Sequence, residues 1–589
     1  MDRNSLIGLL LIGLIFIVWM QLLSPSKPKQ QPLPKRADTT QTATASIDSD
    51  SLKKLEAFEK VRALGMFSSA AEGEEKLITI ETDLFTAVLS SKGATLKSFV
   101  QKKYLNEERK PFDLITSPNG ATALFFQTRD GKNITTTDLY FTPKVESDKL
   151  TISGQQSAKI PFELTLEGGK KIEIVYTFVG NLYRFDYQTN LVGLGEIVQN
   201  GEYQVVWNGG IAHSEKNKLD EAMRSYAHAM QAGELLKLDA EKAGETRKEN
   251  PDGKTKWVSV QSKYFIAAII NENESKGAYL QGYRNTNDEK LVFEDYIVAL
   301  REDLPFKQNE VKGKFALYVG PLDYDLLKDN DVGLERAIDF GWEWLTRPFA
   351  EWLIVPVFNF LNQYISNYGI IIIIFAFLIK LVTYPLTAAS TNSMKKMATL
   401  QPQLQAVQEK YKNDPAKLQT ELSKIYKEAG VNPLSGCLPV LLQMPLLIAM
   451  YNVFSASIQL RQESFLWADD LSAPDAVIHF PFSIPLYGDH IAVYPILMAI
   501  SIYIQQKITP QQSGAMAEQM KIMTYIFPIM MLLFFNNLPA GLGLYYFMFN
   551  VFGLIQQVYT NLTLPKPATK PVQAVAPASK PKKKKEKVA

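Results

Sequence analysis

Apolar residues follow two different patterns along the chain. Six long apolar runs each approach the length that a helix needs to cross a hydrocarbon core of about 30 Å, at about 1.5 Å per residue. They lie at residues 5–23, 364–386, 434–459, 491–508, 520–535 and 538–560. Over 76–326, by contrast, short β-branched and aromatic runs alternate with period two between Gly, Asn and Asp. The pattern predicts a polytopic α-helical membrane protein of six spans with a large, antiparallel, all-β sandwich after the first span.

The first run predicts an uncleaved anchor, residues 1–23, rather than a signal peptide. Signal peptides have apolar regions of about 7 to 15 residues that end at small residues. Here Trp19, Met20 and Gln21 end the run. Residues 24–60 are rich in Pro, Lys, Gln, Thr and Ser and have little apolar surface to bury, which predicts a flexible tether to the β-domain over 61–330.

Two amphipathic segments flank the second span, which we assign to 353–387. Residues 331–352 mix charged residues with tryptophans, which indicates an interfacial amphipathic helix in the headgroup plane; an ordinary linker helix is the alternative. Residues 388–433 carry apolar positions at helical spacing, with Asp414 as an N-cap and Gly430 as a terminator. They predict a helical hairpin with lysines on its outer surface. The third to sixth spans then occupy 434–561.

Charge predicts the orientation of these spans. The segment 388–433 carries seven lysines and the tail over 562–589 ends in KPKKKKEKVA, whereas 461–490 carries five acidic residues against Arg461 alone. Positively charged loops stay in the cytoplasm. We therefore expect the hairpin and both termini inside and the β-domain outside, although the basic residues over 27–36 oppose this orientation.

Few residues suggest covalent chemistry. The single cysteine, Cys437, excludes an intramolecular disulfide, and the net charge of +2 says little about partners. The β-domain has only His213 and His228, without metal-ligand spacing, a phosphate loop or a nucleophile motif. His213 with Glu215 could serve sugar chemistry in the concave face of a sandwich, a minor alternative. We expect no catalytic residue, cofactor or metal.

Lys380 is the one charged residue in IIIIFAFLIKLVTYPLT, residues 371–387. An unrelieved lysine at mid-helix costs about 2.5 to 3.5 kcal/mol in the bilayer. Its side chain could reach the headgroups, about 9 Å away along the helix, or it could face a hydrated cavity. The other spans contain no Asp or Glu to pair with it. They do contain several uncharged polar residues, which favours the cavity: Gln443, Gln505, Gln506, Thr524, Asn550, Gln556 and Gln557.

Several long motifs, in order along nearly the whole chain, resemble one family. They are YVGPLDYDLLK, YPLTAASTNSMKKMATLQPQLQ, VNPLSGCLPVLLQMPLLIAMY, LWADDLSAPD, KIMTYIFPIM and LPAGLGLYYFMFN. These motifs are similar to those of the YidC membrane protein insertases of the YidC/Oxa/Alb family, in the Gram-negative form with a large periplasmic domain. The resemblance implies a multi-pass protein of the bacterial inner membrane.

The resemblance also implies a mechanism and its residues. In that family five spans enclose a hydrophilic groove with a positive residue, usually Arg, and Lys380 matches that residue here. The implied substrate groove comprises Lys380, Gln443, Met444, Pro445, Leu447, Tyr525, Pro528 and Tyr546. The implied partners are nascent integral membrane proteins, the Sec translocon, the ribosome at the hairpin and tail, and membrane lipids, with no specific nucleic-acid sequence. The family's sandwich resembles sugar-binding domains, without an implied enzymatic role.

Two other classes of function remain alternatives. A polytopic transporter or channel would need a ligand site at mid-bilayer, but the spans lack acidic partners and Gly-broken half-helices. An enzyme built on the β-domain and tethered by the first span would need a catalytic motif that the sequence does not offer.

Overall fold

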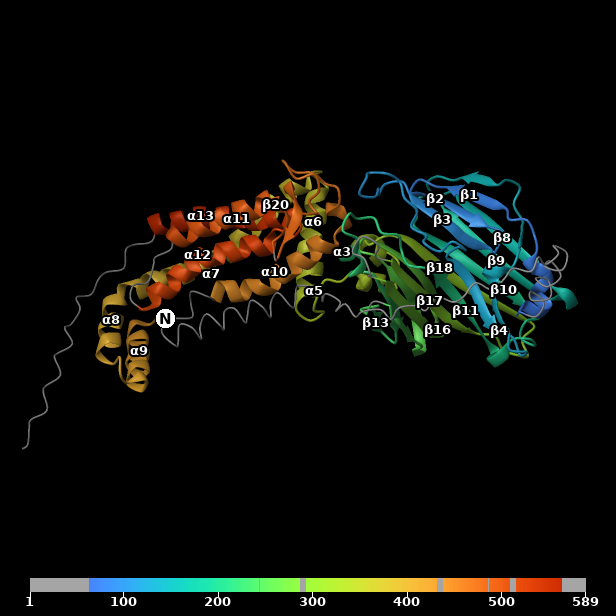
Figure 1. The fold of residues 1–589 in the computed structure, drawn as a ribbon, viewed down its shortest axis with the longest axis horizontal. Coiled ribbons are helices and arrows are strands. Elements are labelled where there is room, and N and C mark those ends of the chain that lie inside the picture. Colours follow the sequence, from blue (N-terminus) through green and yellow to red (C-terminus); the bar gives the residue numbers. More distant parts are fainter. Residues whose placement is uncertain are drawn as a thin grey trace, which may run out of the picture. The chain divides into compact units, whose positions relative to one another are not determined.

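The structure is a computed structural model that describes residues 63–242, 244–285, 293–431, 438–485, 487–508 and 515–563. The predicted first span, its tether and nearly all of the basic tail lie outside the described residues. The chain divides into two compact units, Met1–Asp339 and Phe340–Ala589. We call them the β-unit and the helical unit, and each is described by itself (Figure 1).

The β-unit contains two sheets. The smaller has the strand order β3 (Thr95–Gln101), β2 (Phe85–Ser90), β1 (Leu77–Glu81) and β7 (Lys149–Thr151). The larger runs β5 (Asn133–Thr135), β4 (Thr122–Gln127), β11 (Glu202–Asn208), β17 (Phe293–Asp303), β16 (Phe265–Asn285), β18 (Glu310–Pro321), β10 (Arg184–Val192), β9 (Lys171–Val179), β8 (Ser157–Thr165) and β6 (Thr142–Pro143). Four further strands extend it beside β16: β12 (Tyr226–Gln231), β13 (Glu234–Leu238), β14 (Thr246–Glu249) and β15 (Asp252–Gln261).

Aromatic side chains fill the space between the two sheets. Phe85 and Phe99 of the smaller sheet stack at 4.3 Å between ring centroids, and Phe99 lies 6.4 Å from Phe185 of the larger sheet. Phe178 stacks on Phe185 at 4.5 Å. Residues of β8 and β10 alternate between buried and less buried positions, as half-buried strands require. The predicted β-rich domain is thus confirmed.

One strand pair departs from the antiparallel prediction. β7 pairs with β1 in parallel, in the register Thr79 to Lys149. A strand of three residues carries too little period-two pattern to reveal its partner or its direction. Short helices α3 (Lys218–Ala222) and α4 (Tyr324–Lys328) lie between strands or after them.

The helical unit follows the apolar runs. Its long helices are α7 (Tyr368–Thr399), α10 (Leu438–Ala456), α11 (Val493–Ile508), α12 (Ala515–Phe535) and α13 (Ala540–Thr563), with α8 (Gln401–Lys410) and α9 (Pro415–Ala429) between α7 and α10. A two-stranded sheet, β19 (Ala476–Ile484) and β20 (Gly488–Ala492), lies between α10 and α11. Among the described residues α7 is the helix long and apolar enough to cross a membrane, and 441–456 and 524–535 are shorter apolar helices.

The segment expected to form one interfacial helix is divided. The structure has a 3-10 turn at Leu334–Ala337, then α5 (Thr346–Phe349), a π-helical turn at Ala350–Ile354 and α6 (Val355–Asn362). Gly333 and Gly341 adopt φ of 77° and 85°. These left-handed conformations favour glycine and interrupt a helix.

Helix packing is ordered around α13. It packs against α7 and α11, while α12 packs on α11 and α10 contacts α7 and α5. Rings join these helices: Phe375 of α7 lies 6.0 Å from Tyr545 of α13, and Phe377 lies 5.4 Å from Phe552. The trio α7, α13 and α11 therefore forms the centre of the helical unit.

Helices α8 and α9 form a separate pair. Asp414 caps α9 by accepting a hydrogen bond from the Lys417 backbone N–H at 3.2 Å, and Gly430 ends it with φ of 60°. Leu404 and Val407 of α8 are buried, and α8 packs against α9.

Candidate functional site

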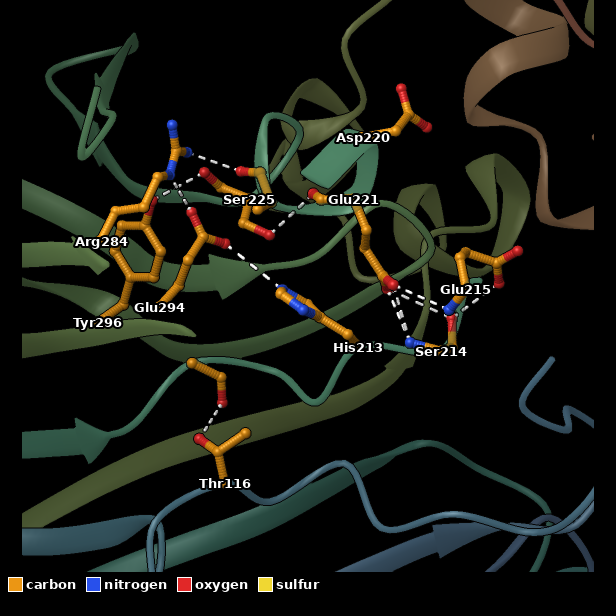
Figure 2. Close-up of polar contacts among 12 residues, drawn as sticks. Thr116, His213, Ser214, Glu215, Asp220, Glu221, Ser225, Arg284, Glu294 and Tyr296 are labelled. Atoms are coloured by element: carbon orange, nitrogen blue, oxygen red, sulfur yellow. Dashed lines mark hydrogen bonds and ion pairs between the residues drawn. The ribbon is translucent and has the colours of Figure 1, made fainter. Parts of the chain in front are cut away.

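The β-unit contains a buried network of charged side chains, shown in Figure 2. Arg284 at the end of β16 donates to Glu294 of β17 at 2.5 Å and to Asp239 at 3.0 Å, and its guanidinium also bonds the Ala222 carbonyl at 2.7 Å. His213 Nε2 lies 3.6 Å from the second oxygen of Glu294. Every charge in this chain of contacts has a partner of opposite sign or a hydrogen bond.

Glu221 forms the second half of the network. Its carboxylate is fully buried and accepts the backbone N–H groups of Ser214 at 2.8 Å and Glu215 at 2.9 Å. Burial raises the pKa of this carboxyl group, against the effect of these hydrogen bonds and of His213. The carboxylate thereby fixes the loop that carries His213.

This arrangement does not support sugar chemistry by His213 and Glu215. The imidazole faces Glu294 and not Glu215, whose carboxylate accepts from the Ser214 hydroxyl at 2.9 Å (Figure 2). Within the described ranges no group of three or more His, Cys, Asp or Glu side chains could hold a metal ion. The network is a structural element of the β-unit.

Lys380 lies in the centre of the helical unit. It is in α7 and only 8% of it is exposed. Its ammonium lies 3.9 Å from the centroid of the Phe549 ring of α13, a cation–π contact. Among the residues that the structure describes, Lys380 forms no ion pair. The Lys380 side chain therefore points into the helix bundle, where an aromatic face takes the place of a carboxylate.

Gly553 makes room for this ammonium. A Cβ placed on Gly553 would lie 2.9 Å from Lys380 Nζ and 3.1 Å from Gln505 Nε2. Phe549, Gly553 and Gln556 are three or four residues apart on α13 and therefore share one face of that helix. Lys380, Gln505 and this face of α13 come together from three helices, and Lys380 precedes the other two groups by more than a hundred residues in the chain.

The other predicted site residues are distributed over α10, α12 and α13. Gln443, Met444, Pro445 and Leu447 are all partly buried on α10. Tyr525 of α12 is half exposed and lies near Tyr503 and Lys507 of α11, with its hydroxyl 3.4 Å from Lys507 Nζ. Pro528 is buried.

Tyr546 belongs to a different part of α13. Its ring packs on Phe535 at 4.8 Å, beside the turn that joins α12 to α13. No hydrogen bond or ring contact joins Tyr546 or the α10 residues to Lys380 in the described part of the chain.

The connection between α10 and α11 forms a polar network at one end of the bundle. Asp475 accepts hydrogen bonds from the backbone N–H groups of Val493 and Tyr494 and from Trp467 Nε1, each at 2.8 to 3.0 Å. It therefore caps the first turn of α11. Burial raises the pKa of Asp475 in spite of these donors.

Sequence analysis missed Phe549 and Gly553. An aromatic residue and a glycine are common in apolar helices, and neither identifies its neighbours across the bundle. The available signal was their spacing of four residues, which places the large ring of Phe549 next to the missing side chain of Gly553 on one face of α13.

A bundle of apolar helices around the buried ammonium of Lys380, together with a separate β-rich domain, is the arrangement expected of a membrane protein with a large β-rich domain. Comparison with known proteins then gives the family. A family model described as "60Kd inner membrane protein" matches residues 360–567, and one described as "YidC periplasmic domain" matches residues 77–352. The chain belongs to the YidC membrane protein insertase family of the bacterial inner membrane.

Curated relatives match over nearly their full length. Membrane protein insertase YidC of Chloroherpeton thalassium is 57% identical and is covered over 96% of each chain. Those of Pelodictyon phaeoclathratiforme and Chlorobium luteolum are 53% and 52% identical, over 96% and 99% of this chain and 95% and 99% of theirs. The function is membrane protein insertion, which is not an enzymatic reaction, and the substrates are nascent membrane proteins.

Solved structures are more distant. A crystal structure described as an active YidC insertase with the first transmembrane domain resolved is 20% identical, with a TM-score of 0.34, over 87% of this chain and 99% of that one. A galactose mutarotase related enzyme from Lactobacillus acidophilus is 10% identical, with a TM-score of 0.28, over 41% of this chain and 97% of that one. At these scores neither likeness supports an argument about the site.

Proposed function

We propose that this insertase works through a hydrated intramembrane groove in which Lys380 attracts polar segments of the incoming protein. The observation that supports this most is the buried ammonium of Lys380, which has an aromatic partner and no carboxylate among the described residues. A buried lysine kept without a counter-ion costs free energy, and such residues mark functional sites in membranes. Snorkelling, the alternative, fits poorly with a side chain that contacts α13.

Uncharged polar groups near this lysine support the hydration of the groove. Gln505 lies beside Gly553, and both side-chain polar atoms of Gln556 are buried without a hydrogen-bond partner in the described chain. Buried amides are normally satisfied by protein or water. Water around them would shorten the low-dielectric path that a hydrophilic segment has to cross.

In this proposal the substrate's own apolar helix passes between α10 and α12. Gln443, Met444, Pro445 and Leu447 lie on α10, and Tyr525 and Pro528 lie on α12, each helix packing on a different member of the central trio. Tyr546 then supports the turn between α12 and α13 through Phe535. Release into lipid follows from burial of apolar surface.

The proposed topology has six spans, with the β-unit in the periplasm and both termini in the cytoplasm. The lysine-rich pair α8 and α9 and the basic tail then face the ribosome and anionic lipid headgroups, and the protein acts alone or with the Sec translocon. The charge asymmetry between 388–433 and 461–490 supports this orientation.

Three substitutions test the role of the charge. Lys380→Arg should keep insertion of a single-span substrate with an acidic translocated tail, whereas Lys380→Ala and Lys380→Glu should impair it in proteoliposomes. A substrate with an uncharged tail is the matched control and should respond less. Full activity of Lys380→Glu, in a variant that integrates normally, would overturn the proposal.

Crosslinking tests the substrate path independently. A photoreactive amino acid at Met444 should crosslink to a nascent membrane protein during its synthesis, and the same probe at exposed Lys159 of β8 should not. A transporter or channel would give no such crosslink at either position.

A further inference from the structure

The hairpin formed by β19 and β20 exposes apolar side chains, and its one charged residue, Asp489, lies in β20 beside His490. Residues 476–488, AVIHFPFSIPLYG, contain no Asp, Glu, Lys or Arg. The exposed apolar residues on β19 are Val477, Ile478, Phe482 and Ile484. Phe480 stacks on Phe482 at 5.6 Å between ring centroids. Neither the proposed groove nor the insertase family assignment gives these residues a function.

One face of β19 is apolar and exposed. Ile478, Phe480, Phe482 and Ile484 alternate with His479, Pro481 and Ser483, so the four apolar side chains share one face of the strand. Ile478 and Phe482 on that face are 53% and 60% exposed, and Val477, at a register shift between the strands, is 50% exposed. A two-stranded hairpin is at best marginally stable alone in water. The exposed face therefore requires an apolar environment.

Strand β20 and the end of the turn before it are held firmly. The Asn536 side chain donates to the carbonyls of Tyr487 and His490, each at 2.8 Å, and accepts from the Ala492 N–H at 3.0 Å. His490 also bonds the Asn536 carbonyl through Nε2 at 2.9 Å. The hairpin is thus fixed to the turn between α12 and α13, and its apolar residues project from a defined place.

That place is the end of the membrane helices. The hairpin begins after α10 and ends where α11 begins, at the end of the helical unit away from α8 and α9 (Figure 1). Leu466 and Trp467 in the same connection are exposed as well. The exposed apolar side chains therefore lie at one end of the apolar helices, and aromatic side chains are enriched at the ends of membrane spans.

The backbone limits how deep the hairpin can lie. Its sheet has two strands and hence two open edges. Unpaired backbone groups are not tolerated in the hydrocarbon core. We propose that the β19–β20 hairpin binds lipid, with Phe482, Val477 and Ile478 in the interfacial layer of the leaflet where α10 ends, and so anchors the outer end of α11.

Lipid quenching tests the proposal on the full chain. With Cys437 replaced by serine, Phe482→Cys is labelled with an environment-sensitive dye in proteoliposomes. We expect blue-shifted emission and stronger quenching by lipids with a spin label near the headgroup than by lipids labelled at the chain end. The control, Lys159→Cys on the exposed face of β8, should show water-like emission and no quenching.

A second variant separates lipid binding from a protein contact. In the Val477→Cys background, Phe482→Asp should lose most of the quenching, while Phe482→Tyr should keep it, because tyrosine suits the interface. Water-like emission at both labelled positions would overturn the proposal. So would blue-shifted emission that spin-labelled lipid does not quench, since a second copy or another protein would then cover the hairpin. These outcomes are independent of insertion activity and of the groove.

Discussion

The β-unit and the helical unit each contain a buried cation, Arg284 and Lys380, and the surroundings of the two cations differ. Arg284 is surrounded by Glu294, Asp239 and the Ala222 carbonyl. Lys380 has the face of Phe549 and forms no ion pair in the described chain. Both side chains are less than a tenth exposed. Similar burial therefore accompanies opposite electrostatic environments.

The difference distinguishes the structural charge of Arg284 from the functional charge that we propose for Lys380. A buried ion pair satisfies its own groups, and removing one partner leaves the other desolvated and unpaired. A buried lysine without a counter-ion leaves its attraction available for a ligand, at a cost to the stability of the helix bundle. The same substitution should thus have opposite effects in the two units.

The largest expected effect is that of Arg284→Met on the β-unit. It leaves Glu294 and Asp239 buried without their cation, which should cost about 3 to 5 kcal/mol of unfolding free energy. Hydrogen exchange of the β16 and β17 amides in the full chain measures this loss. Lys380→Met should leave exchange in α7 and α13 unchanged or slower. If Lys380→Met unfolds the helical unit, the contrast between the two cations fails.

A matched control for this effect lies on the surface of the same unit. Arg184 pairs with Glu272, whose side chain is 65% exposed. Arg184→Met should cost less than about 1 kcal/mol, because solvent screens an exposed pair. If Arg184→Met costs as much unfolding free energy as Arg284→Met, the effect comes from the packing of the arginine side chain and not from its buried charge.

The next effect concerns a buried base that remains uncharged. Burial, together with the positive charge of Lys237, lowers the pKa of His228 in β12 to about 3. Below about pH 6.5 the unfolded chain binds a proton that the folded imidazole does not, so stability falls as pH decreases from 6.5 towards 3. At pH 5 the loss should be about 2 kcal/mol.

Replacing the imidazole should remove this pH dependence. Amide exchange rates in β12 and β15 are measured for wild type and for His228→Leu at pH 5 and at pH 7.5. At each pH the wild-type rate is divided by the rate of the variant, which cancels the intrinsic effect of pH on exchange. The ratio should shift towards faster exchange in wild type at pH 5. An equal ratio at both values would show that His228 is protonated in the folded β-unit.

A smaller effect is expected at the aromatic partner of Lys380. Phe549→Leu removes a cation–π contact worth about 0.5 to 2 kcal/mol, which should lower insertion of an acidic-tailed substrate by about two- to thirtyfold. Phe549→Tyr keeps the aromatic face and should keep activity. Insertion of an uncharged tail should change little in both variants. Equal losses for the two tails would indicate a packing defect.

Much of this architecture follows from hydrophobic pattern alone. The apolar run at 491–508 forms α11, Val493–Ile508, because a mostly apolar segment of this length has few alternatives to a helix in a membrane. Lys380 was identifiable for the same reason, as a costly exception within such a run. The pattern did not reveal that α7 continues to Thr399, since its last turns are amphipathic.

Contacts between distant segments were not predictable. Which ring of α13 covers the Lys380 ammonium depends on the rotation of two helices, and that is set by packing across the whole bundle. His213 was paired with its neighbour Glu215 in sequence, whereas the fold places it beside Glu294 of β17. Likewise, Gly333 and Gly341 divided a segment whose charged and aromatic spacing suited one helix.

The smallest effect on insertion is expected from the largest change to the chain. Removing most of residues 60–320 while keeping the preceding segment and residue 330 onward should leave insertion largely intact. The two parts are compact units by contact, the buried charges of Arg284 and Glu294 are paired within the β-unit, and Lys380 and the other residues of the proposed groove all lie in the helical unit. Complementation of an insertase-depleted strain measures the result, with Lys380→Glu in the same truncated chain as the inactive control. Loss of viability at normal levels of the truncated protein would mean that the β-unit contributes to insertion itself, and that paired charges alone do not mark a region as structural.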